Sequence, residues 1–291
     1  MPPLATALVL TAALLHASWN LLLKGARGDA VSVSWLTATL GTLVYAPVAL
    51  LLQGEALAGW SAAVWLAVLV SGVVHVAYFI TLQRGYRAAD LSVVYPVARG
   101  VGPLLTAFVA IAWLGEPAGP LSLAGIALVV CGTFTLAGGF ALMRGGWTPR
   151  LRAGLGWGAL TGVLIAAYTV NDGHAVRTLG AAPLLFYMLS DACRAVILTP
   201  WAMRRAGAVR TAMRQDWRAV VGVALLSPLA YVLVLQAMTM APISHVAPAR
   251  EVSMLIAAFL GARVLAEGEL ARRLAGAALI ASGVACLALA R

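Results

Sequence analysis

The sequence repeats itself after about 151 residues. The clearest matches pair a residue of the first half with the same residue type in the second half: Tyr78 and Tyr231, Ala89 and Ala241, Arg99 and Arg250, Glu116 and Glu267, Gly125 and Gly276, Gly132 and Gly283. The step between matches falls from 153 to 151 along the chain, as two single-residue gaps between duplicated halves require. Because the repeated stretches are strongly apolar, the pattern predicts a membrane protein built from two copies of one unit.

Composition supports a membrane protein. Hydrophobic residues make up 62% of the chain and charged residues only 10%, against about 45–50% and about 25% in soluble domains. The formal net charge is +10, but the basic residues fall between apolar segments, and no patch interleaves them with aromatic residues. We therefore expect a lipid bilayer around the chain and no nucleic acid as a partner.

The apolar segments predict ten membrane-spanning helices, each near the ~20 residues that a bilayer core requires, and hence an all-α integral membrane protein. The predicted spans are residues 4–23, 31–52, 61–83, 91–114, 121–142, 154–176, 182–203, 217–238, 244–265 and 272–290. The connections between them are short and leave no room for a soluble domain. The longest, residues 204–216, is basic, and we expect it to lie along the membrane surface.

Ten helices in two copies give five helices per repeat. Because five is odd, the second repeat enters the membrane from the side opposite to the first, so the repeats are predicted to be inverted about a pseudo-twofold axis in the membrane plane. We place the first repeat at residues 1–143 and the second at residues 154–291, joined by a loop over residues 144–153. This architecture is typical of transporters, whose substrate site lies where the repeats meet.

Lysine and arginine gather at one set of predicted helix ends. Arg99, Arg194 and Arg250 lie inside spans, and Arg177 and Arg291 lie at the opposite ends. The other fifteen are Lys24, Arg27, Arg84, Arg87, Arg144, Arg150, Arg152, Arg204, Arg205, Arg210, Arg214, Arg218, Arg263, Arg272 and Arg273. The positive-inside rule places these fifteen in the cytoplasm and predicts both termini outside. Compact loops, and a start without the basic region of a signal peptide, indicate a bacterial inner membrane.

The sequence carries no catalytic or metal-binding pattern. Cys131, Cys193 and Cys286 each sit in an apolar segment without metal-ligand spacing, so we expect packing roles for them, and no metal or cofactor. The spans contain no HExxH, GxSxG or Walker A motif. Their absence argues against a membrane-embedded enzyme and against ATP hydrolysis by this chain.

Several motifs carry a family resemblance. In chain order they are His16-Ala17-Ser18-Trp19-Asn20 with Lys24, then Ala167-Tyr168-Thr169-Val170-Asn171-Asp172-Gly173, then Pro248-Ala249-Arg250-Glu251 ahead of Gly261, Glu267 and Gly276. Together they resemble the EamA-type branch of the drug/metabolite transporter superfamily over the whole chain. The resemblance implies ten helices in two inverted repeats and movement of small metabolites, often export of amino acids or related compounds. The opening motif is also similar to members associated with phosphonate utilisation. Several family members are thought to keep both termini in the cytoplasm, whereas the charge bias here predicts the reverse.

Arg99 and Arg250 are the strongest candidate substrate-binding residues. They occupy equivalent repeat positions inside spans, where a charged group is costly unless it is paired or hydrated. A pseudo-twofold axis brings such positions toward a shared cavity, and a guanidinium binds carboxylate or phosphonate in a bidentate manner. The alternative is that Arg99 reaches the interface along its stem, and that Arg250 is neutralised by Glu251.

Prolines and glycines predict how these helices pack. Pro96, Pro103 and Pro248 each remove a backbone donor, and the resulting breaks either line a cavity or are ordinary kinks. Glycines spaced by four or seven residues predict close helix packing, and they are Gly154, Gly158 and Gly162 in the sixth span and Gly276 and Gly283 in the tenth.

The first span carries a polar stripe. His16 and Asn20 are four residues apart and share one face, with Trp19 beside them. Asn171 lies 151 residues after Asn20, which matches the repeat step. We expect these residues to contact substrate or a coupling proton, or else to hold neighbouring helices together through hydrogen bonds.

Three acids in or near spans are candidates for proton coupling: Asp172, Asp191 and Glu251. Burial raises the pKa of a carboxyl group toward physiological pH, which suits a proton carrier. Two plainer readings stay open. Asp191 is placed to neutralise Arg194 on the same helix, and Asp172 falls near the outer end of its span, where headgroup water would hydrate it.

Aromatic residues add surface that can line a pathway or pack in the core. Tyr78 and Tyr231 are repeat equivalents, and Tyr95, Tyr168 and His75 share the same group of helices. A different histidine, His245, follows an outer turn, and we expect it to be solvated.

The function we expect is secondary transport of a small polar metabolite, anionic or zwitterionic, by alternating access between the repeats. The main alternative is a lipid or lipid-linked-sugar translocase of the same fold, whose walls between the repeats would be apolar. A membrane-embedded enzyme is the least favoured reading. A homodimer is left open.

Overall fold

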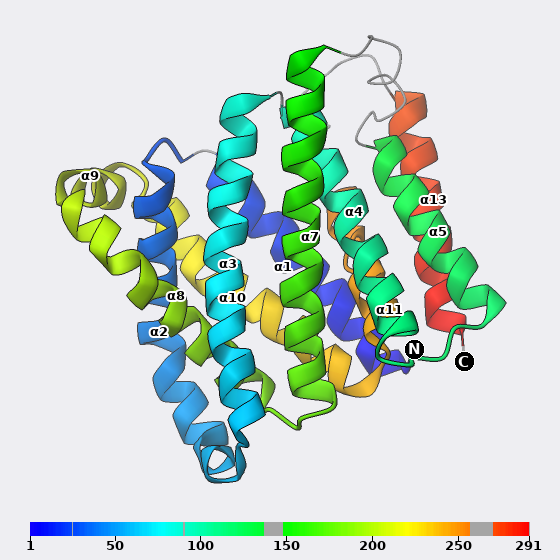
Figure 1. The fold of residues 1–291 in the computed structure, drawn as a ribbon, viewed down its shortest axis with the longest axis horizontal. Helices are drawn as coiled ribbons and strands as arrows, with labels where there is room; N and C mark the ends of the chain where they lie inside the picture. Colours follow the sequence, from blue (N-terminus) through cyan, green and yellow to red (C-terminus); the bar gives the residue numbers. More distant parts are fainter. Residues whose placement is uncertain (25, 90, 137–147, 257–269, 291) are drawn as a thin grey trace.

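The computed structural model describes residues 1–24, 26–89, 91–136, 148–256 and 270–290, and regular structure in them is helical (Figure 1). The elements are α1 (Pro3–Lys24), α2 (Ala30–Gln53), the 3-10 helix η1 (Gly54–Gly59), α3 (Ala62–Ala88), α4 (Leu91–Ala112), α5 (Pro120–Leu136), α7 (Pro149–Arg177), α8 (Pro183–Arg204), α9 (Ala206–Gln215), α10 (Trp217–Met240), α11 (Ile243–Ala249) and α13 (Leu270–Leu289). Among them α1, α2, α3, α4, α7 and α10 are long and apolar enough to cross a membrane. The protein is an all-helical membrane protein.

The ninth predicted span is a broken helix. Its first part is α11, which ends at Ala249, and the chain is helical again over residues 252–256. The break follows Pro248, and the turn is closed by short-range bonds in which Glu251 N donates to Pro248 O at 2.9 Å and Ser253 N donates to Arg250 O at 3.1 Å. Proline disrupts a helix in this way because it has no N–H and crowds the preceding turn. By contrast, α4 continues through both of its prolines.

Other predicted bounds differ in detail. The sixth helix, α7, begins at Pro149 with Thr148 as its N-cap, five residues before the predicted start. The basic connection after α8, for which no helix was predicted, contains the helix α9. The ends of the predicted fifth and ninth spans, and Glu267 with them, lie outside the described residues.

The helices pair in the pattern that two inverted repeats require. Equivalent helices of the two repeats pack against each other, namely α2 with α8, α4 with α11, and α5 with α13. A further matched couple is formed by α1 on α10 and α3 on α7. Exchanging the two repeats maps these contacts onto one another, so they are consistent with a pseudo-twofold axis. The extensive contact of α4 with α7 departs from this symmetry, because α11 makes no comparable contact with α1 within the described residues.

The contact between α5 and α13 shows this symmetry at single residues. Gly125 and Gly283 face each other, and a Cβ added to either would lie 2.9 or 2.7 Å from the carbonyl oxygen of the other. Gly132 likewise faces Gly276, with a Cβ on Gly132 2.9 Å from the Gly276 oxygen. In the repeat, Gly125 matches Gly276 and Gly132 matches Gly283. Exchanging the two repeats therefore turns the contact of Gly125 with Gly283 into the contact of Gly276 with Gly132, as twofold symmetry requires.

The glycines of α7 pack as predicted. Cβ atoms added to Gly154, Gly158 and Gly162 would lie 2.7–2.8 Å from the side chains of successive valines of α4. Without side chains at these positions, the two helices approach closely along a shared length. This contact places α4, which carries Arg99, against α7, which carries Asp172.

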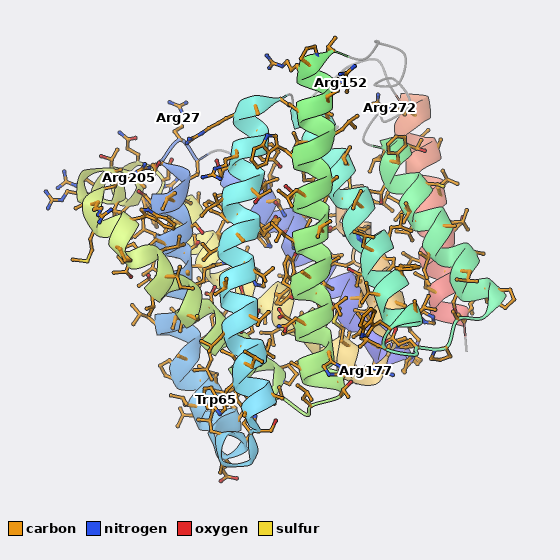
Figure 2. The ribbon with its side chains drawn as sticks, viewed as in Figure 1. Arg27, Trp65, Arg152, Arg177, Arg205 and Arg272 are labelled. Atoms are coloured by element: carbon orange, nitrogen blue, oxygen red, sulfur yellow. The ribbon has the colours of Figure 1, made fainter. Side chains whose placement is uncertain are left out.

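Figure 2 shows the predicted charge asymmetry in space. Arg27, Arg152, Arg205 and Arg272 lie at one end of the bundle, while Arg177 lies at the opposite end. Both termini lie at that opposite end (Figure 1), where the amino group of Met1 donates to Ala288 O at 2.8 Å. We call these the basic end and the terminal end.

Candidate substrate site between the repeats

Arg99 of α4 is buried and ion-paired. Its side chain points inward, with Nη2 2.9 Å from Oε2 of Glu251 and 3.3 Å from Oγ of Ser253, to which it donates. Only 9% of the residue is exposed. The reading in which Arg99 reaches the membrane interface is therefore wrong, because the second repeat supplies a carboxylate at the depth where this guanidinium lies.

Arg250, which follows the last residue of α11 in the broken ninth span, is buried without an ion-pair partner in the described chain. It is 4% exposed, and in the described part of the chain no carboxylate forms an ion pair with it and its Nε has no hydrogen-bond partner. Glu251 forms its direct ion pair with Arg99, although the charge of Arg250 also acts on this carboxylate. A buried guanidinium outside a direct ion pair is costly, so this position is suited to bind an anion.

The first helix contributes His16 and Trp19 near the arginines. The two rings meet edge to face with centroids 4.7 Å apart, and the charges of Arg99 and Arg250 both act on the imidazole of His16. Asn20 turns to its own helix, where its amide donates to His16 O at 2.7 Å. The predicted stripe is therefore split, with its histidine close to the arginines and its asparagine engaged in a local backbone bond.

Asp172 of α7 forms a second polar centre. The residue is 0% exposed. Tyr231 Oη donates to its Oδ2 at 2.8 Å, and Asn171 Nδ2 donates to its Oδ1 at 2.9 Å and to Ala67 O at 2.9 Å. The expectation that headgroup water hydrates Asp172 is wrong, because α7 continues to Arg177 and α3 and α10 cover this part of it.

An aromatic group surrounds this centre. His75 stacks on Tyr168 with centroids 4.2 Å apart and meets Tyr231 edge-on at 5.9 Å. Tyr78 lies 5.8 Å from Tyr168, and Tyr187 lies 5.1 Å from Tyr231. The repeat equivalents Tyr78 and Tyr231 are thus brought into one group, together with Tyr187, which sequence reasoning missed. Its signal was available, since Tyr187 lies one helical turn before the acid Asp191 in α8.

Two other predicted residues lie at the edges of these centres, Tyr95 near Arg99 and Asp191 near Tyr187. Tyr95 lies one turn before Arg99 on α4 and is 36% exposed, more open than the buried tyrosines. Asp191 is buried and pairs with Arg194 of its own helix, Oδ1 to Nη2 2.8 Å. The plainer interpretation of Asp191, mutual neutralisation with Arg194, describes this geometry.

Arg250 connects the polar centres. Its charge acts on the neighbouring Glu251. It also acts on five side chains drawn from four other helices, namely His16, His75, Tyr78, Asp172 and Tyr231. We call the set of these five with Arg99, Arg250 and Glu251 the interior site. Both repeats contribute to it, as expected for a site at the repeat interface.

Comparison with known proteins decides the family. The sequence profile of the EamA-like transporter family matches residues 3–138 and 152–289. The chain belongs to the EamA-like transporter family. Its members are transporters, not enzymes. A solved structure with the plain title "Crystal structure of protein" is similar at a TM-score of 0.76 and 18% sequence identity, over 98% of this chain and 96% of that chain, which supports the fold alone. No curated protein matches the sequence significantly.

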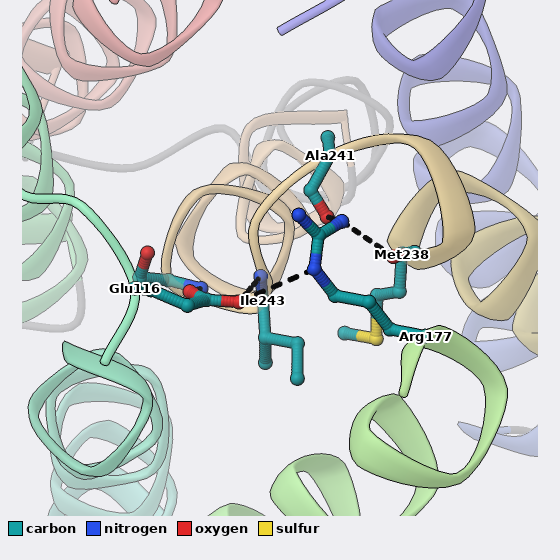
Figure 3. Close-up of polar contacts among 6 residues, drawn as sticks. Glu116, Arg177, Met238, Ala241 and Ile243 are labelled. Carbon is teal, nitrogen blue, oxygen red and sulfur yellow. Dashed lines mark hydrogen bonds and ion pairs between the residues drawn. The ribbon is translucent and has the colours of Figure 1, made fainter. Parts of the chain in front are cut away.

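This EamA-like transporter is held together at the terminal end by a cluster that sequence reasoning did not single out (Figure 3). The Glu116 carboxylate accepts the backbone N–H groups of Ile243 and Ser244 at 2.7 and 2.8 Å, at the start of α11. Arg177 lies 3.8 Å from the same carboxylate and donates to Met238 O and Ala241 O. We call Glu116, Arg177, Ile243 and Ser244 the terminal clasp.

The terminal clasp joins three parts of the transporter: the connection after α4, the end of α7, and the turn between α10 and α11. A carboxylate at a helix start satisfies N–H groups that have no partner inside the helix. The clasp also explains why His245 is not solvated as expected. The histidine is buried behind this turn, with Nε2 2.9 Å from Ser122 Oγ. The match of Glu116 with Glu267 in the repeat was the signal that pointed to this residue.

Proposed function

We propose that this transporter carries a small polar metabolite with a carboxylate or phosphonate group, such as an amino acid or a related compound, by alternating access. The observation that carries the proposal is Arg250, a buried guanidinium at the repeat interface that pairs with no described carboxylate. An anionic substrate would supply the missing counter-charge and the bidentate contact that a guanidinium makes best.

The balance of charge in the interior site supports one anionic group per substrate. Glu251 neutralises Arg99 at 2.9 Å, so Arg250 remains as the unmatched cation. Across from it, Asp172 and the faces of His75, Tyr168 and Tyr231 form surroundings that suit a cationic group. A zwitterion, with its carboxylate at Arg250 and its ammonium toward Asp172, matches this arrangement.

Of the three candidate acids, Asp172 is the one we assign to proton coupling. Glu251 and Asp191 each have an arginine partner, Arg99 and Arg194 respectively. The hydrogen bonds to Asp172 in the described chain come from neutral groups, a phenol and an amide. A buried carboxylate outside a direct ion pair binds a proton more readily than one held in such a pair.

Alternating access would occur by rocking of the repeat at residues 1–143 against the repeat at residues 154–291. In this proposal the terminal clasp closes one entrance, since Glu116 of the first repeat holds α11 of the second. The positive-inside rule places the terminal end outside and the basic end in the cytoplasm of a bacterial inner membrane. The clasp is then the outer closure.

A thermal-shift screen of the purified protein in detergent tests the proposal. The panel holds amino acids, carboxylates, phosphonates, nucleosides, sugars and cations. A ligand of the folded state at 100 times its dissociation constant stabilises by about 2.7 kcal/mol. We expect a hit among carboxylates, zwitterions or phosphonates that is lost in Arg250→Gln and kept in Arg84→Gln, a control at an exposed helix end. Stabilisation by neutral compounds or cations alone would contradict it. Silence across the panel, together with stabilisation by added lipid, would favour the lipid translocase.

A further inference from the structure

A groove of about 500 Å³ lies at the basic end, between α2, α8 and α9, and it is separate from the interior site. Its walls are mainly apolar and include Trp35, Met203, Val209 and Met213. Arg210 and Arg214 form its rim. Because none of the residues of the interior site lines it, the transport function does not account for it.

The groove is held open by fixed contacts at both ends of α9. At the start, Arg205 Nη1 lies 3.0 Å from Asp29 Oδ1 of the connection before α2. At the end, Asp216 accepts the N–H groups of Arg27 and Gly28 at 3.2 and 2.8 Å. These contacts tie both ends of α9 to the connection between α1 and α2.

The helix α9 is itself amphipathic. Ala212 is fully buried on the side that faces α2, where it packs with Val33, Leu36 and Val220. Arg210 and Arg214 are four residues apart, so they project from one face of α9, and both are exposed. The apolar side of α9 thus packs on the protein, and its basic side is left exposed at the basic end.

We propose that this groove binds one anionic phospholipid, with an acyl chain against the apolar wall and the phosphate between Arg210 and Arg214. Charge complementarity carries the choice of occupant, because an apolar wall with a doubly basic rim fits an amphiphile whose headgroup is negative. The position agrees, since the basic end faces the leaflet in which anionic lipids attract basic segments. Trp35, near the start of α2, donates its Nε1 to Thr199 Oγ1 at 3.0 Å and is thereby fixed in the wall of the groove.

Native mass spectrometry of the detergent-solubilised protein tests this assignment with phosphatidylglycerol and phosphatidylcholine of the same acyl chains. One arginine near an anionic headgroup contributes about fivefold in affinity. We expect tighter binding of phosphatidylglycerol to the wild type, weakened by about tenfold or more in Arg210→Gln/Arg214→Gln. The matched control Arg84→Gln/Arg87→Gln removes the same charge from an exposed end of α3 and should bind as the wild type.

A second variant separates the groove from the general charge of this end. Ala206→Trp fills the groove from an exposed position, so it should fold and should also lose the lipid. Equal affinity for the two lipids, or unchanged binding in either groove variant, would overturn the proposal. So would displacement of the lipid by glycerol phosphate without acyl chains. If the wild type were a dimer and Ala206→Trp dissociated it, the groove would bind a second copy of this chain, and the lipid proposal would be overturned.

Discussion

Two pairs of helices, each made of repeat equivalents, behave differently. In the pair α5 and α13 the contacts are reciprocal, because Gly125 faces Gly283 as Gly132 faces Gly276. In the pair α4 and α11 the equivalent arginines have different partners. Arg99 is paired with Glu251, while Arg250 has no described counter-charge. One pair keeps the symmetry of the duplication and the other has lost it.

The sequence explains where the symmetry ends. Glu251 and Ser253, which hold Arg99, match Gly100 and Gly102 of the first repeat at the same step of 151. The second repeat therefore gives a carboxylate and a hydroxyl to Arg99, and the first repeat has nothing equivalent to give to Arg250. The comparison teaches that the symmetric pair is the frame of this transporter, and that the asymmetric pair marks its site.

The largest effect is expected from Arg99→Met. The substitution leaves the Glu251 carboxylate buried without its partner, and breaking a buried pair in this way costs about 3–5 kcal/mol. Unfolding in detergent, followed by circular dichroism, measures the loss. The double variant Arg99→Met/Glu251→Gln removes both charges and should recover most of the stability. A typical substitution costs about 1 kcal/mol. If Arg99→Met lowered the free energy of unfolding by no more than this, the ion pair with Glu251 would not be formed.

The symmetric pair should respond equally from both sides. Gly132→Ala and Gly283→Ala each place a Cβ within 2.9 Å of backbone atoms of the facing helix, and overpacking of this kind costs about 1–3 kcal/mol. Gly156→Ala is the control, because a Cβ there meets no atom within 4 Å. Thermal unfolding of the three variants compares them. Tolerance of alanine at only one of these two equivalent positions would break the assigned symmetry of α5 and α13.

A smaller loss of stability should distinguish the repeat-equivalent tyrosines Tyr78 and Tyr231. Tyr231→Phe removes the 2.8 Å bond to Asp172 and should cost about 0.6 kcal/mol, and at most about 1.7 kcal/mol, as interhelical bonds in membranes do. Tyr78→Phe should change stability less, because Tyr78 forms no hydrogen bond within the described chain and retains its ring contact with Tyr168. Chemical denaturation resolves the two. A larger loss in Tyr78→Phe than in Tyr231→Phe would reverse the asymmetry described for the interior site.

Much of the frame was predictable from the sequence. Long apolar segments and the repeat step predict the spans and their inversion. The glycine spacing predicts a face of α7 for close packing, but it does not predict that α4 is the partner. The site was predictable only in part. Arg99 and Arg250 stood out as charges inside spans, but their partners did not. Glu251 follows Arg250 directly, and adjacent residues of a helix point in different directions, so neighbours in sequence are poor ion-pair partners.

The depth of a polar residue was the second limit. Asp172 and His245 fall near predicted span ends, which suggested contact with water for both. Their burial depends on what covers those ends: α3 and α10 for Asp172, and the terminal clasp for His245. These contacts come from remote parts of the chain, and apolar periodicity within one segment carries no information on them.

The central claim is that Arg250 binds the anionic group of the transported metabolite. Counterflow uptake in proteoliposomes, with the ligand that stabilises the protein most, tests it directly. Arg250→Lys keeps the charge but loses the bidentate fork, so uptake should fall at least tenfold, corresponding to about 1.4 kcal/mol. Arg84→Lys should transport as the wild type. Wild-type uptake by Arg250→Lys and by Arg250→Gln alike would contradict the claim and place the anion site elsewhere.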